Sequence, residues 1–199
     1  MKKIKQVVAA AALFGCMCGF AGTVTVEGKG SVKNYNYCVG TGFLSTPFLL
    51  QELTEAGASE TAYKVLLNPQ KPGWLYEVLR GATTIWETWE GYVGKGAFDK
   101  GSTGSLNHYS PGAVCQWLFD TCTGIRVAGE NHFVIAPIPG DGLEYAEACY
   151  RSIYGEVRSC WQKTGIGVKY TVTIPSNCTA EVILPHEPPI VVAAGTYFF

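Results

Sequence analysis

The sequence is poor in charged residues. Only 16% of its 199 residues are Asp, Glu, Lys or Arg, and the formal net charge is -1. A protein that binds a polyanion presents a concentration of positive charge. Nearly equal numbers of acidic and basic residues give no net positive charge of this kind. We therefore expect no nucleic-acid partner.

Long apolar runs are also scarce, and the one that is present lies at the N-terminus. Three lysines within the first five residues precede an apolar run at 7–14, and small residues follow as far as Gly22. This order is typical of an export signal, although a hydrophobic start left by truncation would look similar. Residues 1–22 are therefore interpreted as a signal-like segment. If it is used, the protein is exported and becomes periplasmic, extracellular or lipid-anchored; otherwise it is cytoplasmic.

No later run reaches the roughly 18 apolar residues that a membrane-spanning helix needs, so no stable membrane span is expected. The sequence has no Cys-x-x-Cys pair and no Cys/His group with zinc-ligand spacing, and its glycine-rich stretches match no phosphate-binding loop. We therefore predict no metal and no cofactor. The cysteines beyond the signal-like segment are predicted to be free, buried thiols: Cys38, Cys115, Cys122, Cys149, Cys160 and Cys178.

The first half of the remaining chain has helical periodicity. Apolar residues recur at helical spacing after Thr46, which we expect to be an N-cap, and after Ser59, which we expect to cap a second helix. Further helices are predicted from Trp74 to Leu79 and from Pro111 to Cys122.

From Ile125 the hydrophobic period changes towards two. Apolar residues alternate with others around 133–135, 157–161, 170–174 and 180–184, and turn residues at 139–142, 164–167 and 175–177 separate these segments. Short alternating strands of this kind predict an antiparallel β-sandwich.

The residue with the clearest chemical potential is Glu87, which lies between Trp86 and Trp89 in residues 81–91 (GATTIWETWEG). Flanking indole rings can lower the local dielectric around a carboxyl group, and an indole can also stack on a pyranose ring. Glu87 is therefore a candidate general acid or base in a sugar cleft. The alternative is a half-buried glutamate that binds loop backbone.

Four ordered segments resemble signatures of the α-L-rhamnosidases of glycoside hydrolase family 78. They are residues 40–47 (GTGFLSTP), 81–87 (GATTIWE), 107–109 (NHY) and 132–137 (HFVIAP), and the resemblance covers about residues 35 to 199. It implies an α+β chain in which the last hairpins of an (α/α)6 six-hairpin barrel, at 23–124, precede a C-terminal β-sandwich at 125–199. It also implies inverting hydrolysis of terminal α-L-rhamnosyl residues in glycosides or polysaccharides, without a metal at the reaction centre.

Carried over residue by residue, the resemblance makes Glu87 the general base that activates water. His108 matches a sugar-contacting histidine, and Trp86, Trp89 and Asn107 are its expected neighbours in the rhamnose subsite.

Two departures from the family pattern affect the expected activity. Thr88 stands where the family usually has arginine, which removes a cation beside the base. The family's general acid lies in an upstream stretch that nothing in this sequence matches, and inversion requires two carboxyl groups. We therefore predict a rhamnosidase fragment that is weak or inactive alone and that has the missing N-terminal part of the enzyme as a possible partner. The alternatives are a non-catalytic rhamnose-binding module and a chain that completes another chain's barrel.

A barrel remnant should also expose faces that its missing neighbours would cover. We therefore expect the helical half to be the less stable one and to expose a patch that includes Phe43, Leu50 and Leu53.

Overall fold

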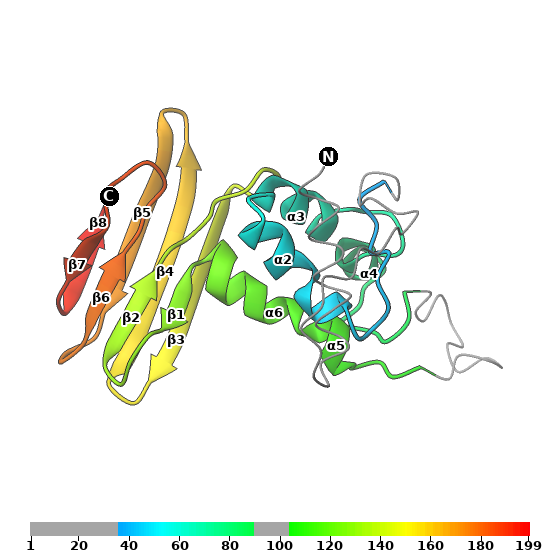
Figure 1. Cartoon of the computed structure of the whole chain (residues 1–199), viewed down its shortest axis with the longest axis horizontal. Helices are drawn as coiled ribbons and strands as arrows, with labels where there is room; N and C mark the ends of the chain where they lie inside the picture. Colours follow the sequence, from blue (N-terminus) through cyan, green and yellow to red (C-terminus); the bar gives the residue numbers. More distant parts are fainter. Residues whose placement is uncertain (1–35, 90–103) are drawn as a thin grey trace, which may run out of the picture. The chain divides into compact units, whose positions relative to one another are not determined.

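The computed structural model describes residues 36–89 and 104–199, which belong to two compact units (Figure 1). The helical unit extends to Val114, and the strand unit is Cys115–Phe199. The signal-like segment 1–22 lies outside the described residues, and the predicted domain boundary after Gly124 stays a prediction. In the two described ranges, no helix is long and apolar enough to cross a membrane.

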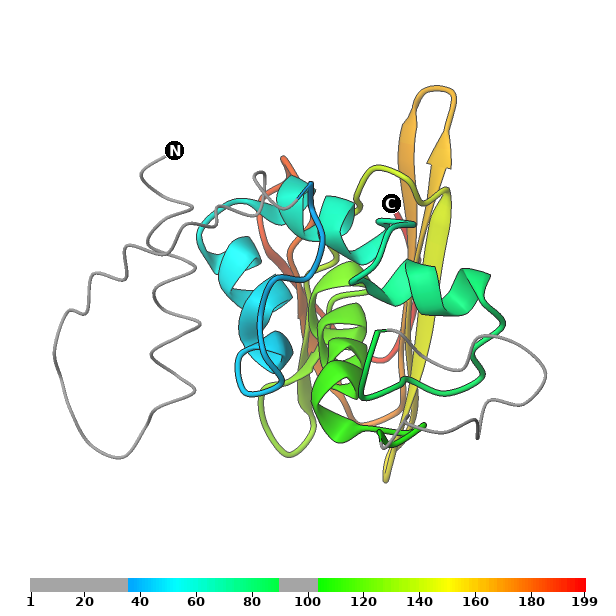
Figure 2. The same cartoon turned by 90° about the vertical axis from the view of Figure 1, so that its right-hand side faces the viewer.

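The helical unit is built from short helices. These are η1 (Thr46–Phe48), α2 (Leu49–Glu55), α3 (Ser59–Leu66), α4 (Trp74–Leu79) and α5 (Tyr109–Gly112). Helices α2 and α3 pack against each other as a hairpin, which both views show (Figures 1 and 2). Gly57 between them has a left-handed φ of 73°, the conformation that glycine adopts without steric cost.

The predicted exposed patch on this unit is mostly wrong. Leu50 is 2% exposed and Leu53 is fully buried, because both side chains lie in the core that α2 shares with α3. Only Phe43 is exposed as expected. A two-helix hairpin can thus bury one apolar face within itself.

The two predicted N-caps are also wrong. Thr46 lies inside η1, and its hydroxyl donates to the carbonyl of Gly42 at 3.0 Å instead of accepting from a helix N–H. Ser59 is the first residue of α3, whose N-cap is Ala58 and has no side-chain cap.

The predicted helix at 111–122 forms as three short pieces. They are α5, α6 (Val114–Trp117) and the π-helical turn η2 (Leu118–Cys122). The first piece begins at Tyr109 because the preceding residue, His108, is its N-cap and accepts the Ser110 N–H on Nδ1 at 3.3 Å.

The strand unit contains two four-stranded sheets, which confirms the predicted sandwich of short strands. One sheet has the order β1-β2-β6-β7 and the other has β3-β4-β5-β8. The strands are β1 (Ile125–Val127), β2 (His132–Ile135), β3 (Tyr145–Ser152), β4 (Gly155–Thr164), β5 (Gly167–Ile174), β6 (Thr179–Val182), β7 (Ile190–Val192) and β8 (Gly195–Phe198). Alternate residues of the inner strands form the core, among them Phe133, Val157, Trp161, Val172 and Val182.

One strand pair departs from the antiparallel expectation. Strands β2 and β6 are parallel, with His132 opposite Thr179 and Ile135 opposite Val182. The other pairs in these sheets are antiparallel. The parallel pair is possible because β3, β4 and β5 lie between β2 and β6 in sequence, so a long connection joins them.

Two buried side chains fasten the π-helical turn to strand β4. The Trp161 indole N–H donates to the carbonyl of Cys122 at 2.7 Å, and the Ser159 hydroxyl donates to that of Thr123 at 2.5 Å. Trp161 is completely buried, so these bonds lie inside the sandwich core and pair carbonyls that the helix end leaves free.

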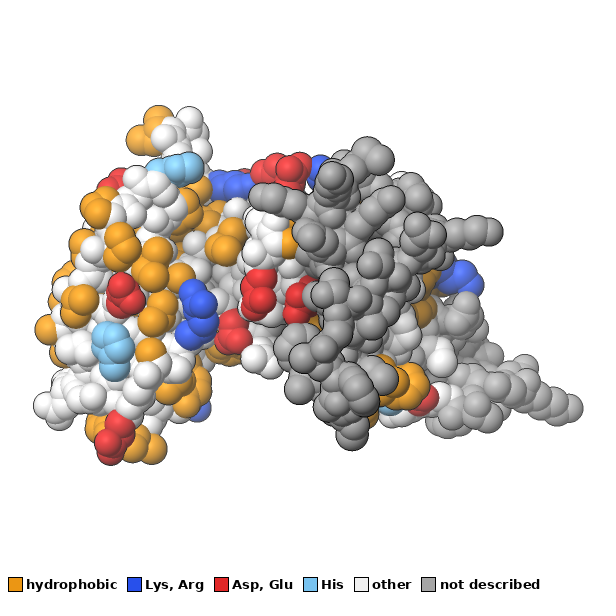
Figure 3. Space-filling view, viewed as in Figure 1, with side chains coloured by type: hydrophobic (Ala, Val, Ile, Leu, Met, Phe, Trp, Pro, Cys, Tyr) orange, Lys and Arg blue, Asp and Glu red, His pale blue; other side chains and the backbone are white. Residues whose placement is uncertain are grey.

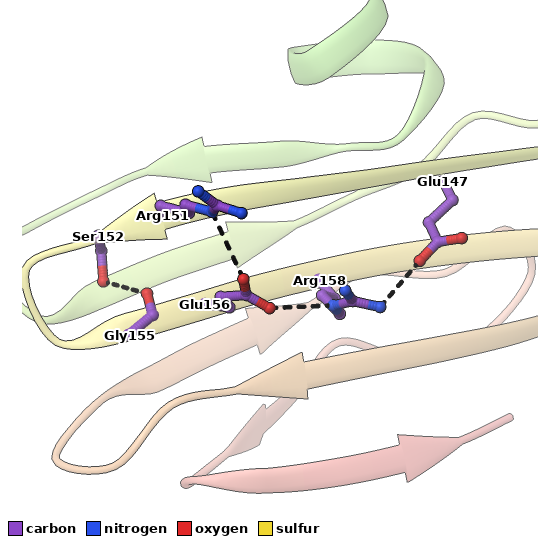
Figure 4. Close-up of polar contacts among 6 residues, drawn as sticks. All are labelled: Glu147, Arg151, Ser152, Gly155, Glu156 and Arg158. Carbon is purple, nitrogen blue, oxygen red and sulfur yellow. Dashed lines mark hydrogen bonds and ion pairs between the residues drawn. The ribbon is translucent and has the colours of Figure 1, made fainter.

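The strand unit presents both hydrophobic and charged side chains at its surface. Its visible face in Figure 3 carries many hydrophobic side chains with few charged ones among them. Four charged residues form a row of ion pairs across β3 and β4: Arg151 with Glu156, Glu156 with Arg158, and Arg158 with Glu147 (Figure 4). These pairs are solvent-exposed, so water screening makes their contribution to stability small.

The hairpin between β4 and β5 projects beyond its neighbours in both cartoon views (Figures 1 and 2), and Ile166 at its tip is 98% exposed.

The six described cysteines are free thiols, as predicted. Cys38, Cys122 and Cys178 are buried, whereas Cys149 and Cys160 are partly exposed. The prediction of burial is wrong for Cys115, which is exposed. Its neighbours on helix α6, Val114 and Trp117, are the buried residues, and Cys115 lies off that face.

Candidate active site

Glu87 and His108 lie on two chain segments that are joined by backbone hydrogen bonds. The Glu87 N–H donates to the carbonyl of Ser105 at 2.9 Å, and the His108 N–H donates to the carbonyl of Ile85 at 2.9 Å. The bonded positions are two apart on the first segment, at 85 and 87, and three apart on the second, at 105 and 108. Glu87 and His108, 21 positions apart in sequence, thus lie on two neighbouring segments joined by a small ladder of two hydrogen bonds.

The Glu87 side chain is exposed and is held at one oxygen. Its Oε2 accepts the Ser105 backbone N–H at 2.7 Å, while Oε1 has no hydrogen-bond partner among the described residues. The predicted desolvated setting between two indole rings is therefore wrong. Trp86 is only 6% exposed, whereas the Glu87 side chain next to it is exposed, so the two side chains lie on different sides of the segment.

A second carboxyl group lies directly behind this segment, on Glu77 of helix α4. Glu77 is 2% exposed, and its Oε2 accepts the Trp86 backbone N–H at 3.1 Å. Its Oε1 has no hydrogen-bond partner among the described residues. Burial raises the pKa of Glu77 to about 7, and the bond from Trp86 opposes part of that rise. Sequence reasoning missed this residue, because a glutamate in an amphipathic helix normally faces water.

His108 is fixed both by its backbone and by its ring. Its Nδ1 accepts the Ser110 N–H, so the neutral ring carries its proton on Nε2. The ring stacks on Tyr109 with centroids 4.9 Å apart and meets Phe43 edge-on at 6.2 Å. The Ser110 hydroxyl also donates to the carbonyl of Phe43, which ties residues 40–47 to the segment that bears His108.

The other predicted site residues lie along the same two segments. Asn107 is exposed, and its backbone N–H donates to the Ser105 hydroxyl at 3.1 Å. Trp89 is partly exposed and packs edge-on against Trp74 with ring centroids 5.7 Å apart. The structure therefore gathers all five residues into one region, with Trp86 on its inner side. Their roles in binding or catalysis stay predictions.

Gly104, next to Ser105 on the second segment, also lies close to the first segment. A Cβ atom on Gly104 would lie 3.3 Å from the Thr88 side chain and 3.6 Å from the Glu87 Cβ. The space beside the Thr88 side chain is thus small.

Within the described part of the chain, these residues belong neither to a group that could hold a metal ion nor to the cavity in the strand unit. Within 36–89 and 104–199, no group of three or more His, Cys, Asp or Glu side chains could hold a metal ion. A cavity of about 680 Å3 opens in the strand unit, where Tyr170, Leu184, His186 and Phe199 contribute to its lining. It includes no predicted site residue.

Comparison with known proteins gives the chain a family. The bacterial α-L-rhamnosidase six-hairpin glycosidase domain matches residues 21–122, and the bacterial α-L-rhamnosidase C-terminal domain matches residues 126–197. An α-L-rhamnosidase of Formosa agariphila is 42% identical over 149 residues, which are 74% of this chain and 16% of that protein. One from Streptomyces avermitilis is 38% identical over 160 residues, 79% of this chain and 16% of that protein. The chain thus spans about a sixth of the length of these curated relatives.

Solved structures give the same result. The native α-L-rhamnosidase of Aspergillus terreus matches with a TM-score of 0.77 and 31% identity over 84% of this chain and 20% of that one. The Streptomyces avermitilis α-L-rhamnosidase, solved with L-rhamnose, matches with a TM-score of 0.74 and 31% identity over 83% of this chain and 18% of that one. Because two adjoining family models cover most of the sequence, the chain belongs to the bacterial α-L-rhamnosidases and carries part of their six-hairpin domain together with their C-terminal domain.

Proposed function

We propose that this chain takes part in the inverting hydrolysis of terminal α-L-rhamnosyl residues and that Glu87 is the general base. The proposal rests on the exposure and the hydrogen bonding of the Glu87 carboxylate. It is exposed, one oxygen is fixed by the Ser105 N–H, and the other has no partner among the described residues. A general base needs an oriented carboxylate with a free oxygen that can accept a proton from water.

The neighbouring residues suit a sugar subsite. His108 can donate from Nε2 to a sugar hydroxyl because Nδ1 is occupied by the Ser110 N–H. Asn107 is exposed and offers an amide, and the partly exposed Trp89 offers an aromatic edge. Trp86 is nearly buried, so we assign it a supporting role beneath Glu87. Rhamnose in a glycoside or polysaccharide is the substrate class that the family implies.

We assign the general acid of the proposed reaction to none of the described residues. Inversion places two carboxyl groups roughly 6.5 to 9.5 Å apart, on opposite faces of the sugar. Glu52, Glu55 and Glu60 belong to helices α2 and α3, and Glu77 is buried behind Trp86. Glu77 binds the Trp86 N–H from the buried side of the segment, so it does not present an acid to a sugar bound at Glu87.

This assignment predicts how the isolated chain treats different substrates. An unactivated rhamnosyl disaccharide needs its leaving oxygen protonated, so we expect no hydrolysis. A p-nitrophenyl α-L-rhamnoside needs little protonation and should be cleaved slowly. Glu87→Gln should abolish that cleavage, while Glu60→Gln, on the exposed side of α3, should leave it unchanged.

Binding gives an independent measure when turnover is too slow to detect. In NMR titrations with L-rhamnose, the amides of Asn107, His108 and Glu87 should shift, and they should do so in Glu87→Gln as well. Hydrolysis that survives Glu87→Gln would contradict the assignment of the base. Absence of both cleavage and rhamnose-induced shifts would contradict a sugar site on this chain.

Binding without cleavage is the second function that the site supports, because the described residues supply one exposed carboxylate of the required pair. A rhamnose-binding module would show the amide shifts and release no p-nitrophenol. If cleavage appeared only after the upstream part of a six-hairpin domain was added, the chain would be the partner that completes that barrel.

A further inference from the structure

We propose that Glu77 is a positioning residue that holds Glu87 in place through the backbone of Trp86. The proposal deepens the proposed function, on which it rests, since Glu87 acts there as the general base. Glu77 does not reach the sugar site itself, and its side-chain bond is to the peptide that precedes Glu87.

Glu77 closes the loop that leads to Glu87 at both of its ends. Its backbone carbonyl accepts the N–H groups of Arg80 and Ala82 at 3.0 and 3.1 Å, where helix α4 ends. Its side chain accepts the Trp86 N–H at 3.1 Å, at the far end of the loop. One residue on a helix thus fixes the entry and the exit of residues 80–86. Because Glu87 is covalently joined to Trp86, a displaced Trp86 peptide would displace the base.

Binding the Trp86 N–H with a buried carboxyl group costs free energy. Glu77 is 2% exposed, and one of its oxygens has no hydrogen-bond partner among the described residues. Burial of a carboxyl group with an unsatisfied oxygen costs free energy that an apolar residue at the same place would not. Removing the carboxyl would instead leave the buried Trp86 N–H unpaired. The contact therefore costs stability at this position while it secures the geometry of the Trp86–Glu87 peptide.

The chemistry of the contact predicts which substitutions preserve it. Glutamine offers the same carbonyl acceptor at the same length, so Glu77→Gln should keep the bond to Trp86. Alanine offers none, so Glu77→Ala should release Trp86. Leu53→Ala is the control for general destabilisation, because Leu53 is a buried residue of α2, the helix that packs against α3.

The test is amide hydrogen exchange on the full chain. In Glu77→Ala, the amides of Glu87 and His108, which make the two bonds of the ladder, should exchange at least tenfold faster than in the wild type. The amides of α2 and α3 should exchange at unchanged rates. Glu77→Gln should resemble the wild type. Leu53→Ala should instead speed exchange in α2 and α3 and leave the exchange of the Glu87 and His108 amides unchanged. Unchanged protection of Glu87 and His108 in Glu77→Ala, or an equal loss throughout the helical unit, would overturn the proposal.

A second measurement covers a Glu77→Ala chain that fails to fold. The Trp86 amide resonance of the wild type should titrate with a midpoint near the raised pKa of Glu77, about 7. The titration should vanish in Glu77→Gln and persist in Glu87→Gln. The reason is that burial and the bond from Trp86 set the pKa of Glu77, and no charged neighbour among the described residues contributes to it. A titration that survives Glu77→Gln would overturn the contact. Neither experiment needs catalysis, so both remain decisive if Glu87→Gln shows that the proposed function is wrong.

Discussion

The indole nitrogen of Trp74 lies 2.9 Å from the carbonyl oxygen of Pro111 and donates a buried hydrogen bond to it. This bond joins the first residue of α4, the helix that carries Glu77, to α5, the helix that His108 caps. The Trp74 ring also supports Trp89 edge-on. One side chain therefore links three segments of the candidate site.

Replacement of this indole should loosen the site. Trp74→Phe keeps an aromatic ring but leaves the Pro111 carbonyl without its buried donor, which should cost about 1–3 kcal/mol. We expect faster hydrogen exchange at His108 and Ser110 and little change in the strand unit.

The matched variant is Trp161→Phe, which removes an indole donor to Cys122 inside the sandwich and should change exchange there instead. If both variants loosened both units equally, exchange would be reporting global unfolding and the local role of Trp74 would be wrong.

The stability of the chain should depend on pH through Glu77. Its pKa is raised to about 7 in the folded protein from an ordinary value of 4.5. The folded state therefore binds more protons than the unfolded state between these values, and the free energy of unfolding should fall as pH rises from about 4.5 to 7. The loss should be on the order of 3 kcal/mol, since a tenfold change in proton affinity is worth about 1.4 kcal/mol.

Urea unfolding at pH 5 and pH 8 measures this dependence. Glu77→Gln cannot titrate and should flatten it. Burial also raises the pKa of Glu52, but Glu52 is present in both proteins and cancels from the comparison. An equal pH dependence in the wild type and in Glu77→Gln would show that Glu77 is not the titrating group.

Helices and strands with one buried and one exposed face could be predicted from the sequence. Helix α4 has the predicted bounds, Trp74–Leu79, and strands β4 and β5 follow the expected alternation. Strand β3 was missed because none of its residues is fully buried, so neither of its faces carries the large apolar residues that would mark a period of two. The parallel pairing of β2 with β6 was missed because it depends on which strands meet after a crossover, and local patterns do not record that.

The candidate site was predicted from motifs, and its physical setting was only partly foreseen. The segments of Glu87 and His108 do lie together, but Glu87 is exposed beside a buried Trp86. The Trp86 N–H is bound by Glu77, whose burial no helical period predicts. Buried polar groups are set by the tertiary partners around them, and a sequence pattern shows only the average preference of the residue type.

Position 124, in the turn before β1, should tolerate no side chain. Gly124 has a φ of 77°, and a Cβ atom there would lie 2.1 Å from the Pro137 nitrogen. Gly124→Ala combines a left-handed conformation with a clash against backbone, so we expect a loss of more than about 3 kcal/mol, measured as a lower Tm.

Gly165→Ala is the control for this change, because no atom lies within 4 Å of a Cβ at that position in the β4–β5 hairpin. A Tm of Gly124→Ala close to that of Gly165→Ala would mean that the turn before β1 can rearrange.

The two functions of His108 should be separable by substitution. Its Nδ1 caps α5, and its Nε2 is the proposed sugar contact. Asparagine is a preferred N-cap residue but cannot place a donor where Nε2 lies. His108→Asn should therefore keep the stability of the helical unit while it weakens L-rhamnose binding at least tenfold in the NMR titration. His108→Ala should lose the cap as well, at about 1 kcal/mol, and bind no better. If His108→Asn bound rhamnose as tightly as the wild type, the histidine would serve the fold alone, and the sugar contact would have to come from Asn107 or Trp89.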